Sequence, residues 1–303
     1  MVEVLLACYN GEKFLREQLD SLIKQDYENF IITIRNDGST DSTASILTDY
    51  ADKYPDKIKI LNDTQNSGSA CKSFIKLIGE ATGDYVMFCD HDDVWMENKI
   101  TTTIAAMQAA ETVCPDLPLL VHTDLIPTDE NLKPLSDSFT KSQRLFPEKN
   151  KLNDLLAQNS VTGCTVMINS ELLSLLKTMP QDVLMHDWWA ALTAAAFGKV
   201  VYLDVATMLY RQHGNNAVGA VSSSGAYVKD RKNTAKERIV SSYEQAMLLY
   251  DTYGYKLSEN NKRLILEYAD CKNKKKLSRI KTIFKYKTHK HGFIKALAQI
   301  FYC

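Results

Sequence analysis

The chain has 303 residues, 45% of them apolar, which is enough for one large globular domain or for one domain with a helical appendage. Its formal net charge is −1, yet residues 271–303 hold ten Lys or Arg and no Asp or Glu, which leaves 26 basic and 37 acidic groups in residues 1–270. Seven scattered cysteines argue against a disulfide framework and a zinc cluster, and they suit a reducing cytoplasm. No apolar window reaches roughly 18 residues, so neither a membrane-spanning helix nor a signal peptide is expected.

Apolar runs and helical patterns alternate through the first 90 residues. Strands are expected at residues 2–8, 30–34, 58–61 and 85–89, and helices at about 15–23, 43–54 and 66–81. Short connections between alternating strands and helices are typical of an α/β fold with a parallel, doubly wound sheet. Such sheets bind ligands at the carboxyl ends of their strands, so the residues that follow each strand are candidates for a site.

Polar residues follow three of these strands, and they are Tyr9-Asn10, Asp37-Gly38 and the run Asp90-His91-Asp92-Asp93. The chain has no Gly-x-Gly-x-x-Gly and no Gly-Lys-Ser/Thr loop, so phosphates would need a cation in place of a glycine-rich cradle. Asp37 lies nearest its strand end and is expected to contact a nucleobase or ribose. Asp41 is better explained as a helix cap.

The acidic run places three carboxylates within four positions, directly after a five-residue apolar strand. Asp is depleted in strands and is rarely buried without a partner. A hard divalent cation takes oxygen ligands of this kind, together with diphosphate oxygens and water. The alternative is a solvated, Asp-rich helix N-terminus, and the position after a buried strand favours the metal.

The middle of the chain continues the same alternation. Further helices are expected at about 95–111, 172–176 and 190–197, and further strands at 119–123, 161–168 and 200–203. The polar segment 127–150 fits an acceptor-side insertion. The run of small residues 217–225 can close over a bound ligand. From residue 227 onward, only helices are expected.

His186-Asp187 precedes Trp188-Trp189 at the start of an expected helix. Asp187 can be the N-cap of that helix, or a carboxylate whose pKa is raised beside aromatic rings and which acts as a general base. The two roles are compatible. Both tryptophans offer flat faces on which a sugar ring can stack.

Arg211 and His213 are separated by one residue in an expected loop with Gly214. A guanidinium can neutralise a diphosphate leaving group, and a neutral imidazole can bind Mn²⁺ or Mg²⁺. A surface Arg and a hydrogen-bonded loop His are the alternatives.

The ten cations of residues 271–303 accompany an apolar stripe at helical spacing, formed by Phe293, Ile294, Leu297, Ile300 and Phe301. Cations beside such a stripe suit the anionic inner face of a membrane. Few aromatic residues are interleaved for base stacking, so a nucleic-acid partner is not expected. A solvated, partly disordered segment is the alternative.

Six motifs in this order resemble the bacterial family 2 glycosyltransferases, which have a GT-A fold. They are Ala7-Cys8-Tyr9-Asn10-Gly11, Asn36-Asp37-Gly38-Ser39-Thr40-Asp41, Phe88-Cys89-Asp90-His91-Asp92-Asp93, Val161-Thr162-Gly163-Cys164-Thr165, His186-Asp187 and Tyr210-Arg211-Gln212-His213-Gly214-Asn215. The pattern is similar to the rhamnosyltransferase branch that builds cell-wall polysaccharides and capsules. It departs from the family at Asn36, where Asp is frequent, and at His91, where Gln is common.

The resemblance implies a role for each matched residue. Tyr9 and Asp37 would hold the nucleobase, Asp90 the ribose, and Asp92 the Mg²⁺ or Mn²⁺. Asp187 would be the base, and Arg211 and His213 would stabilise the diphosphate or complete the metal shell. The remaining expected contacts to the nucleotide sugar come from Asn10, Asn66 and Asp93, and those on the acceptor side come from Gly163, Cys164, Trp188 and Trp189.

By this resemblance the chain is an inverting, metal-dependent glycosyltransferase that moves L-rhamnose from dTDP-β-L-rhamnose to a lipid-linked saccharide at the inner membrane face. A UDP-sugar donor and a catalytically silent sugar-nucleotide binding module are the alternatives, and a homo-oligomer stays open. The expected division is a catalytic domain at 1–226, with a nucleotide half to about 112 and an acceptor half from about 113, and a helical extension at 227–303 with a basic segment from about 271.

Overall fold

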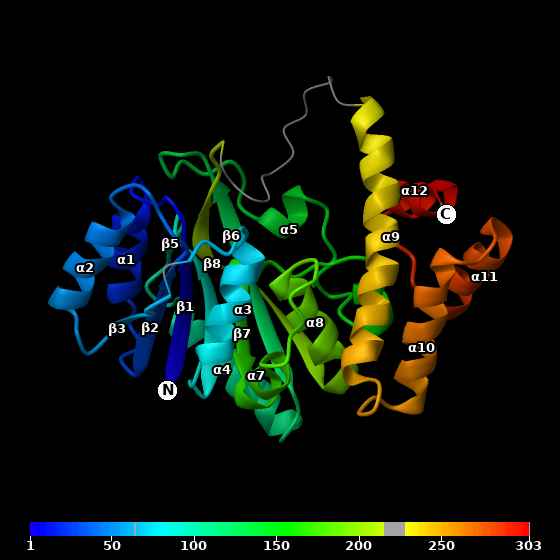
Figure 1. Cartoon of the computed structure of the whole chain (residues 1–303), viewed down its shortest axis with the longest axis horizontal. Coiled ribbons are helices and arrows are strands. Elements are labelled where there is room, and N and C mark those ends of the chain that lie inside the picture. The colour runs from blue at the N-terminus through cyan, green and yellow to red at the C-terminus, as the bar shows by residue number, and fades with distance from the viewer. Residues whose placement is uncertain (64, 215–227, 303) are drawn as a thin grey trace.

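One mixed sheet organises the protein (Figure 1), which is described by a computed structural model over residues 1–63, 65–214 and 228–302. The run 217–225 therefore lies outside the described residues. The strands follow the order β3-β2-β1-β4-β7-β6-β8-β5 across the sheet. Their bounds are Val2–Cys8 (β1), Phe30–Asn36 (β2), Ile58–Ile60 (β3), Tyr85–Asp90 (β4), Val94–Trp95 (β5), Leu119–Thr128 (β6), Val166–Asn169 (β7) and Lys199–Arg211 (β8).

Strands β1 to β4 are mutually parallel, which confirms the predicted α/β sheet. β7 runs antiparallel to both β4 and β6, while β8 is parallel to β6 and antiparallel to β5. In the parallel part, Cys8 is in register with Asn36, and Ala7 with Asp90. The carboxyl ends of β1, β2 and β4 therefore lie together at one edge of the sheet.

Helices cover both faces of the sheet. Their bounds are Leu15–Ile23 (α1), Thr43–Lys53 (α2), Ala70–Glu80 (α3), Lys99–Val113 (α4), Phe139–Ser142 (α5), Leu152–Ala157 (α6), Ser170–Leu176 (α7), His186–Phe197 (α8), Val228–Tyr253 (α9), Glu259–Ala269 (α10), Lys276–Tyr286 (α11) and Phe293–Tyr302 (α12). Two short 3-10 turns lie at Gly163–Thr165 and Asp270–Lys272.

Strand β1 is apolar except for Glu3, whose buried carboxylate accepts hydrogen bonds from the Thr33 hydroxyl and from the Thr82 and Gly83 backbone N–H groups. All seven of its residues are buried, because successive side chains enter two different cores. Val4 and Leu6 pack with α1, α2 and α4 on one face, whereas Leu5 and Ala7 pack with α3, α7 and α8 on the other. A strand buried on both faces needs no polar alternation, which is why its mostly apolar sequence predicted it correctly.

The predicted helix at 95–111 begins at the wrong place. Val94 and Trp95 form the short strand β5, which pairs with Leu209 and Met208 of β8, and α4 begins at Lys99. The partner strand is far away in sequence, so no local pattern could show this pairing. The β5–β8 pairing places the acidic run, which directly precedes β5, beside the end of β8.

Two further boundaries differ from the predictions. Only Val166–Asn169 of the expected strand 161–168 is a strand, because Gly163–Thr165 makes a 3-10 turn. The expected strand 200–203 instead runs from Lys199 to Arg211, so that Arg211 ends a strand and does not lie in a loop.

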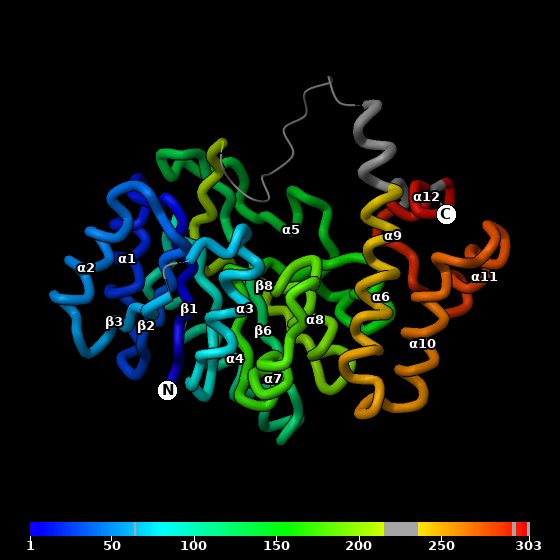
Figure 2. The backbone as a smooth tube through the Cα atoms, in the orientation of Figure 1, coloured from blue at the N-terminus to red at the C-terminus, as the bar shows by residue number. Residues whose placement is uncertain are grey.

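Helix α9 lies between α8 and the helices α10, α11 and α12 in Figures 1 and 2. Tyr253 of α9 lies with its ring centroid 5.9 Å from that of Trp189, and buried residues of α9, α10 and α11 belong to the same hydrophobic core as α8. Among the helices in the described residues, none is both long enough and apolar enough to cross a bilayer. The side chains of Phe293 and Ile294 lie outside the described part of the chain.

Candidate active site

The loop after β2 is held in place by a buried ion pair. Asp37 is buried and accepts hydrogen bonds from the Ser67 backbone N–H at 2.7 Å and the Ser67 hydroxyl at 2.8 Å. The fully buried Arg35 guanidinium also contacts Asp37, and it reaches Asp63 at 3.1 Å. Sequence reasoning missed Arg35, although a charged residue inside the apolar run of β2 was the available signal.

The turn after β1 is tied to this same loop. Asn10 adopts a φ of 48°, a left-handed conformation that Asn tolerates, and its side-chain oxygen accepts the Thr40 N–H at 2.8 Å. Tyr9 leaves 48% of its surface exposed at the edge of the sheet. Asn66 is exposed and accepts the Gly68 N–H at 2.7 Å. The structure thus gathers the expected nucleotide-side residues at one edge, with Asn66 on the rim.

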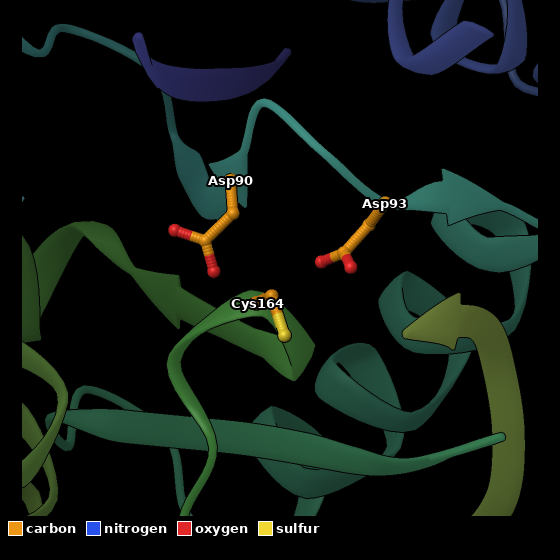
Figure 3. Close-up of side chains that lie close together, drawn as sticks. All are labelled: Asp90, Asp93 and Cys164. Carbon is orange, nitrogen blue, oxygen red and sulfur yellow. The ribbon is translucent and has the colours of Figure 1, made fainter. Parts of the chain in front are cut away.

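The acidic run forms a compact group with a cysteine. Ligand atoms of Asp90, Asp93 and Cys164 all lie within 4.8 Å of one another, and the side chains converge in Figure 3. Asp93 is fully buried, and its Oδ1 accepts the Arg211 backbone N–H at 3.0 Å. Within the described residues, its Oδ2 has no hydrogen-bond partner. Sequence reasoning placed Cys164 on the acceptor side and missed this contact.

Burial, together with the neighbouring Asp92 and Asp187 carboxylates, raises the pKa of the Asp90 carboxyl to about 7. Burial, with Asp92 and Asp90 nearby, also raises the pKa of Asp93 well above its usual value. The fully buried Lys99 lies close by, but its Nζ bonds to the Thr207 hydroxyl at 3.1 Å and, in the described part of the chain, makes no ion pair with these carboxylates. Lys99 thus acts on Asp93 only through its nearby charge, which lowers the pKa of that carboxyl but does not cancel the effect of burial.

Asp92 is paired separately from this group. Its Oδ2 lies 2.8 Å from His213 Nε2, and both side chains are largely buried. The structure thus brings together the two residues that the sequence assigned to a metal. An orphaned buried carboxylate oxygen, raised carboxyl pKa values and a set of mostly oxygen donors all fit a divalent cation.

Asp187 lies in the first turn of α8, and the N-cap residue is Met185. The prediction that Asp187 is the N-cap of this helix is therefore wrong. Its Oδ1 accepts the Trp188 N–H at 2.5 Å and the Asn159 side-chain N–H at 3.4 Å. Burial raises the pKa of this carboxyl to about 6. A methyl group added at Gly163 would lie 3.4 Å from Asp187 Cβ, so glycine lets the Gly163–Thr165 turn approach the carboxylate closely.

The two tryptophans that follow Asp187 differ in their surroundings. Trp189 is fully buried in the core, so the prediction that a sugar stacks on it is wrong: its place on the helix points it toward Tyr253 and away from solvent. Trp188 is half-buried, and its indole N–H donates to the Leu155 carbonyl at 2.7 Å. Only Trp188 keeps an exposed surface beside the site.

Arg211 braces the acidic run from the end of β8. Its Nε donates to the Asp92 carbonyl at 2.8 Å, and its terminal nitrogens contact the Glu130 carbonyl and the Glu17 carboxylate. The guanidinium also lies 4.4 Å from the centre of the Phe14 ring. In the structure, Arg211 therefore holds the main chain of the acidic run against α1.

Comparison with known proteins identifies the family of this chain. The model of glycosyl transferase family 2 matches residues 3–173. The dTDP-rhamnosyl transferase RfbG of Shigella flexneri is 34% identical over 235 residues, which cover 74% of this chain and 77% of RfbG.

Two solved structures share the fold. The mannosyltransferase PcManGT of Pyrobaculum calidifontis, in complex with GDP-Man and Mn²⁺, has a TM-score of 0.57 at 17% identity and covers 99% of this chain and 85% of its own. Residues 1–349 of TarS of S. aureus, in complex with UDP-GlcNAc, have a TM-score of 0.56 at 19% identity, and the match covers 94% of this chain and 89% of that fragment. The family resemblance expected from the six motifs is confirmed: the chain belongs to glycosyl transferase family 2 and is a glycosyltransferase with a GT-A fold.

Proposed function

We propose that the protein transfers L-rhamnose from dTDP-β-L-rhamnose to a hydroxyl of a lipid-linked saccharide, with inversion at the anomeric carbon. The single observation that supports this donor is the 34% identity to a dTDP-rhamnosyl transferase over 74% of the chain. Support for the chemistry comes from the site, where the Gly163–Thr165 turn contacts the buried Asp187 through Gly163 and the acidic group through Cys164.

In this proposal, Asp187 is the general base. Its ionised carboxylate removes the proton of the acceptor hydroxyl while the hydroxyl oxygen bonds to the anomeric carbon. On the opposite face, the bond from that carbon to the diphosphate oxygen breaks, and its electron pair leaves with the diphosphate. The hydrogen bonds from Trp188 and Asn159 hold the carboxylate in one orientation.

Asp92 and His213, with Asp90, Asp93 and Cys164 beside them, are the residues we propose for a divalent cation, Mg²⁺ or Mn²⁺. When bound, the cation supplies positive charge where the leaving diphosphate develops negative charge. Arg211 braces the Asp92 main chain, and the family resemblance further implies that it stabilises the diphosphate.

The donor nucleotide is proposed to lie at the edge formed by β1, β2 and β4. Tyr9 offers an exposed ring for the nucleobase, and Asp37 is held at its side of the edge by Arg35 and Ser67. Asn10 and Asn66 lie on the adjoining loops, and Asp90 is proposed to bind the ribose. On the acceptor side, Trp188 provides an exposed surface beside Asp187.

A panel of sugar nucleotides tests the donor. We expect dTDP-rhamnose to be turned over in the presence of Mn²⁺ and a lipid-linked saccharide extract, and dTDP to stabilise the protein against heat more than UDP does. Turnover of UDP-glucose, UDP-galactose, UDP-galactofuranose or a UDP-N-acetylhexosamine without turnover of dTDP-rhamnose would replace the proposed donor. Release of nucleoside diphosphate and transfer to lipid are measured separately, so an unsuitable acceptor is recognised as such.

The dependence of activity on pH follows from the environment of Asp187. Burial raises the pKa of its carboxyl to about 6, and a general base works only when it is ionised. With saturating donor and cation, we therefore expect kcat to fall about tenfold per pH unit below about 6 and to level off above it. A pH profile that stays flat from 5 to 8 would contradict Asp187 as the base.

The proposal also includes the acceptor and the cellular location of the enzyme. A lipid-linked saccharide presents its hydroxyl at the inner face of the cell membrane, and the ten cations of residues 271–303 suit an anionic surface there. The protein would then act as a peripheral enzyme at that face.

A further inference from the structure

Helix α11 turns apolar side chains outward, into solvent. Leu277 is 76% exposed and Phe284 is 58% exposed. They are seven residues apart, so they lie on the same side of the helix, while Thr282 and Ile283 face inward and are buried. A helix that packs on a core normally buries its large apolar residues. α11 instead carries one apolar side inward and a second one outward.

Helix α12 also exposes large apolar side chains, and its end contacts the start of α11. Phe301 is 78% exposed, and Leu297, one turn earlier, is also exposed. Lys276 Nζ donates to the Phe301 carbonyl at 3.3 Å and lies 5.4 Å from the centre of its ring, which joins the end of α12 to the start of α11. We call the exposed side chains of Leu277, Phe284, Leu297 and Phe301, with those of Lys276, Lys281 and Lys285, the basic apolar surface.

The charges on this surface are of one sign. Residues 271–303 contain ten cations and no Asp or Glu. Lys272 and Lys274 pair with acidic residues of α9 and α10. Lys276, Lys281 and Lys285 are exposed and, within the described residues, form no ion pair. Within the described residues, the lysines that flank the exposed apolar side chains are therefore not paired with a carboxylate and can bind an anionic partner.

The place of the surface in the fold leaves it accessible. α11 and α12 lie at the end of the molecule that is farthest from α1 and α2 (Figure 2), and the core contacts of α11 are made by its other side. Within the described residues no helix can span a bilayer, so contact with a membrane would be at its surface. Large apolar side chains among lysines are the composition of helices that lie in the headgroup layer.

We propose that the basic apolar surface docks onto an anionic lipid bilayer, with the lysines at the lipid phosphates and Leu277, Phe284, Leu297 and Phe301 inserted among the acyl chains near the headgroups. Lysines alone would serve any polyanion, but they do not explain four exposed apolar side chains beside them. Nucleic acid offers no apolar layer to bury these side chains. The inference deepens the proposed function by naming the surface that brings the enzyme to a lipid-linked acceptor.

Co-sedimentation with vesicles tests the docking and uses neither donor nor acceptor, so its outcome is independent of the proposed transfer. The full chain is incubated with vesicles of phosphatidylglycerol and phosphatidylcholine, or of phosphatidylcholine alone. We expect binding to the anionic vesicles, weaker binding at high salt, and little binding to the neutral ones. Equal sedimentation with both vesicle types, or with neither, would overturn the proposal.

Two triple variants distinguish the contribution of the apolar side chains to vesicle binding from that of the lysines. The triple change Leu277→Ser, Phe284→Ser and Phe301→Ser should lower the partition onto anionic vesicles by at least about tenfold. The triple change Lys276→Gln, Lys281→Gln and Lys285→Gln should lower it by about as much and remove most of its salt dependence. These residues are exposed and remote from the candidate active site, so dTDP-rhamnose hydrolysis should stay unchanged.

The matched control removes equally exposed apolar side chains elsewhere. Val113 is 74% exposed and Tyr255 is 77% exposed, and neither belongs to the basic apolar surface. Val113→Ser with Tyr255→Ser should therefore sediment as the parent chain does. If it lost binding as the α11 and α12 variants do, or if the apolar triple variant sedimented like the parent, the proposed surface would be wrong. Stronger retention by RNA than by anionic vesicles would overturn it as well.

Discussion

Replacing Asp187 with Asn is expected to lower the rate of sugar transfer by about 10²–10⁴-fold, the usual contribution of a positioned general base. Asn has the same shape, so its side-chain oxygen can still accept the Trp188 N–H, and the fold should be preserved. Donor binding should be retained, because Asp187 acts on the acceptor hydroxyl. The measurements are kcat for transfer and the dissociation constant of dTDP.

The control for this change is Asp182→Asn, which alters an exposed carboxyl just before α8 and should leave kcat unchanged. Unchanged transfer in Asp187→Asn would contradict its role as the base and would favour a silent sugar-nucleotide binding module. A parallel loss of dTDP binding and transfer would instead point to a structural role for Asp187.

Replacing Asp92 with Ala should abolish the divalent-dependent part of the activity. Asp92 is proposed to hold the cation, whose charge stabilisation is worth several kcal/mol, which corresponds to a rate loss on the order of 10²–10³-fold. The change also removes the 2.8 Å contact with His213. Mn²⁺ binding is followed by electron paramagnetic resonance, which gives a readout that does not depend on turnover.

Asp52→Ala is the matched control, because Asp52 is exposed on α2 and should change neither Mn²⁺ binding nor rate. Full activity of the parent protein in EDTA would contradict a cation requirement altogether. Normal Mn²⁺ binding in Asp92→Ala would instead transfer the ligand role to the group of Asp90, Asp93 and Cys164, whose ligand atoms lie within 4.8 Å of one another.

Local sequence patterns were sufficient for most of the sheet. Strands such as β1 and β4 are mostly apolar because both of their faces are covered by helices, so burial leaves a direct signal in composition. The polar residues after β1, β2 and β4 could likewise be grouped in advance, since parallel strands bring their carboxyl ends to one edge. The six motifs, in their order, also identified the family.

Other features depended on partners far away in the sequence. Val94–Trp95 is a strand only because β8 lies beside it. The contacts of the Arg211 guanidinium with Glu17 and two backbone carbonyls were not foreseen, because local sequence does not bring these groups near it. Trp189 looked like a platform for a sugar, but its direction depends on the rotation of α8 against Tyr253.

By itself, the sequence determined the α/β class, the family, the carboxylates of the site and the basic character of residues 271–303, because each of these depends on residue type and local spacing. Only the tertiary structure decided that Asp93 and Asp90 converge on Cys164, that Asp92 meets His213, and that α11 turns Leu277 and Phe284 outward. The first two contacts join residues more than 70 positions apart in the sequence. The exposure of Leu277 and Phe284 depends on which side of α11 the core covers. A local sequence pattern determines neither of these.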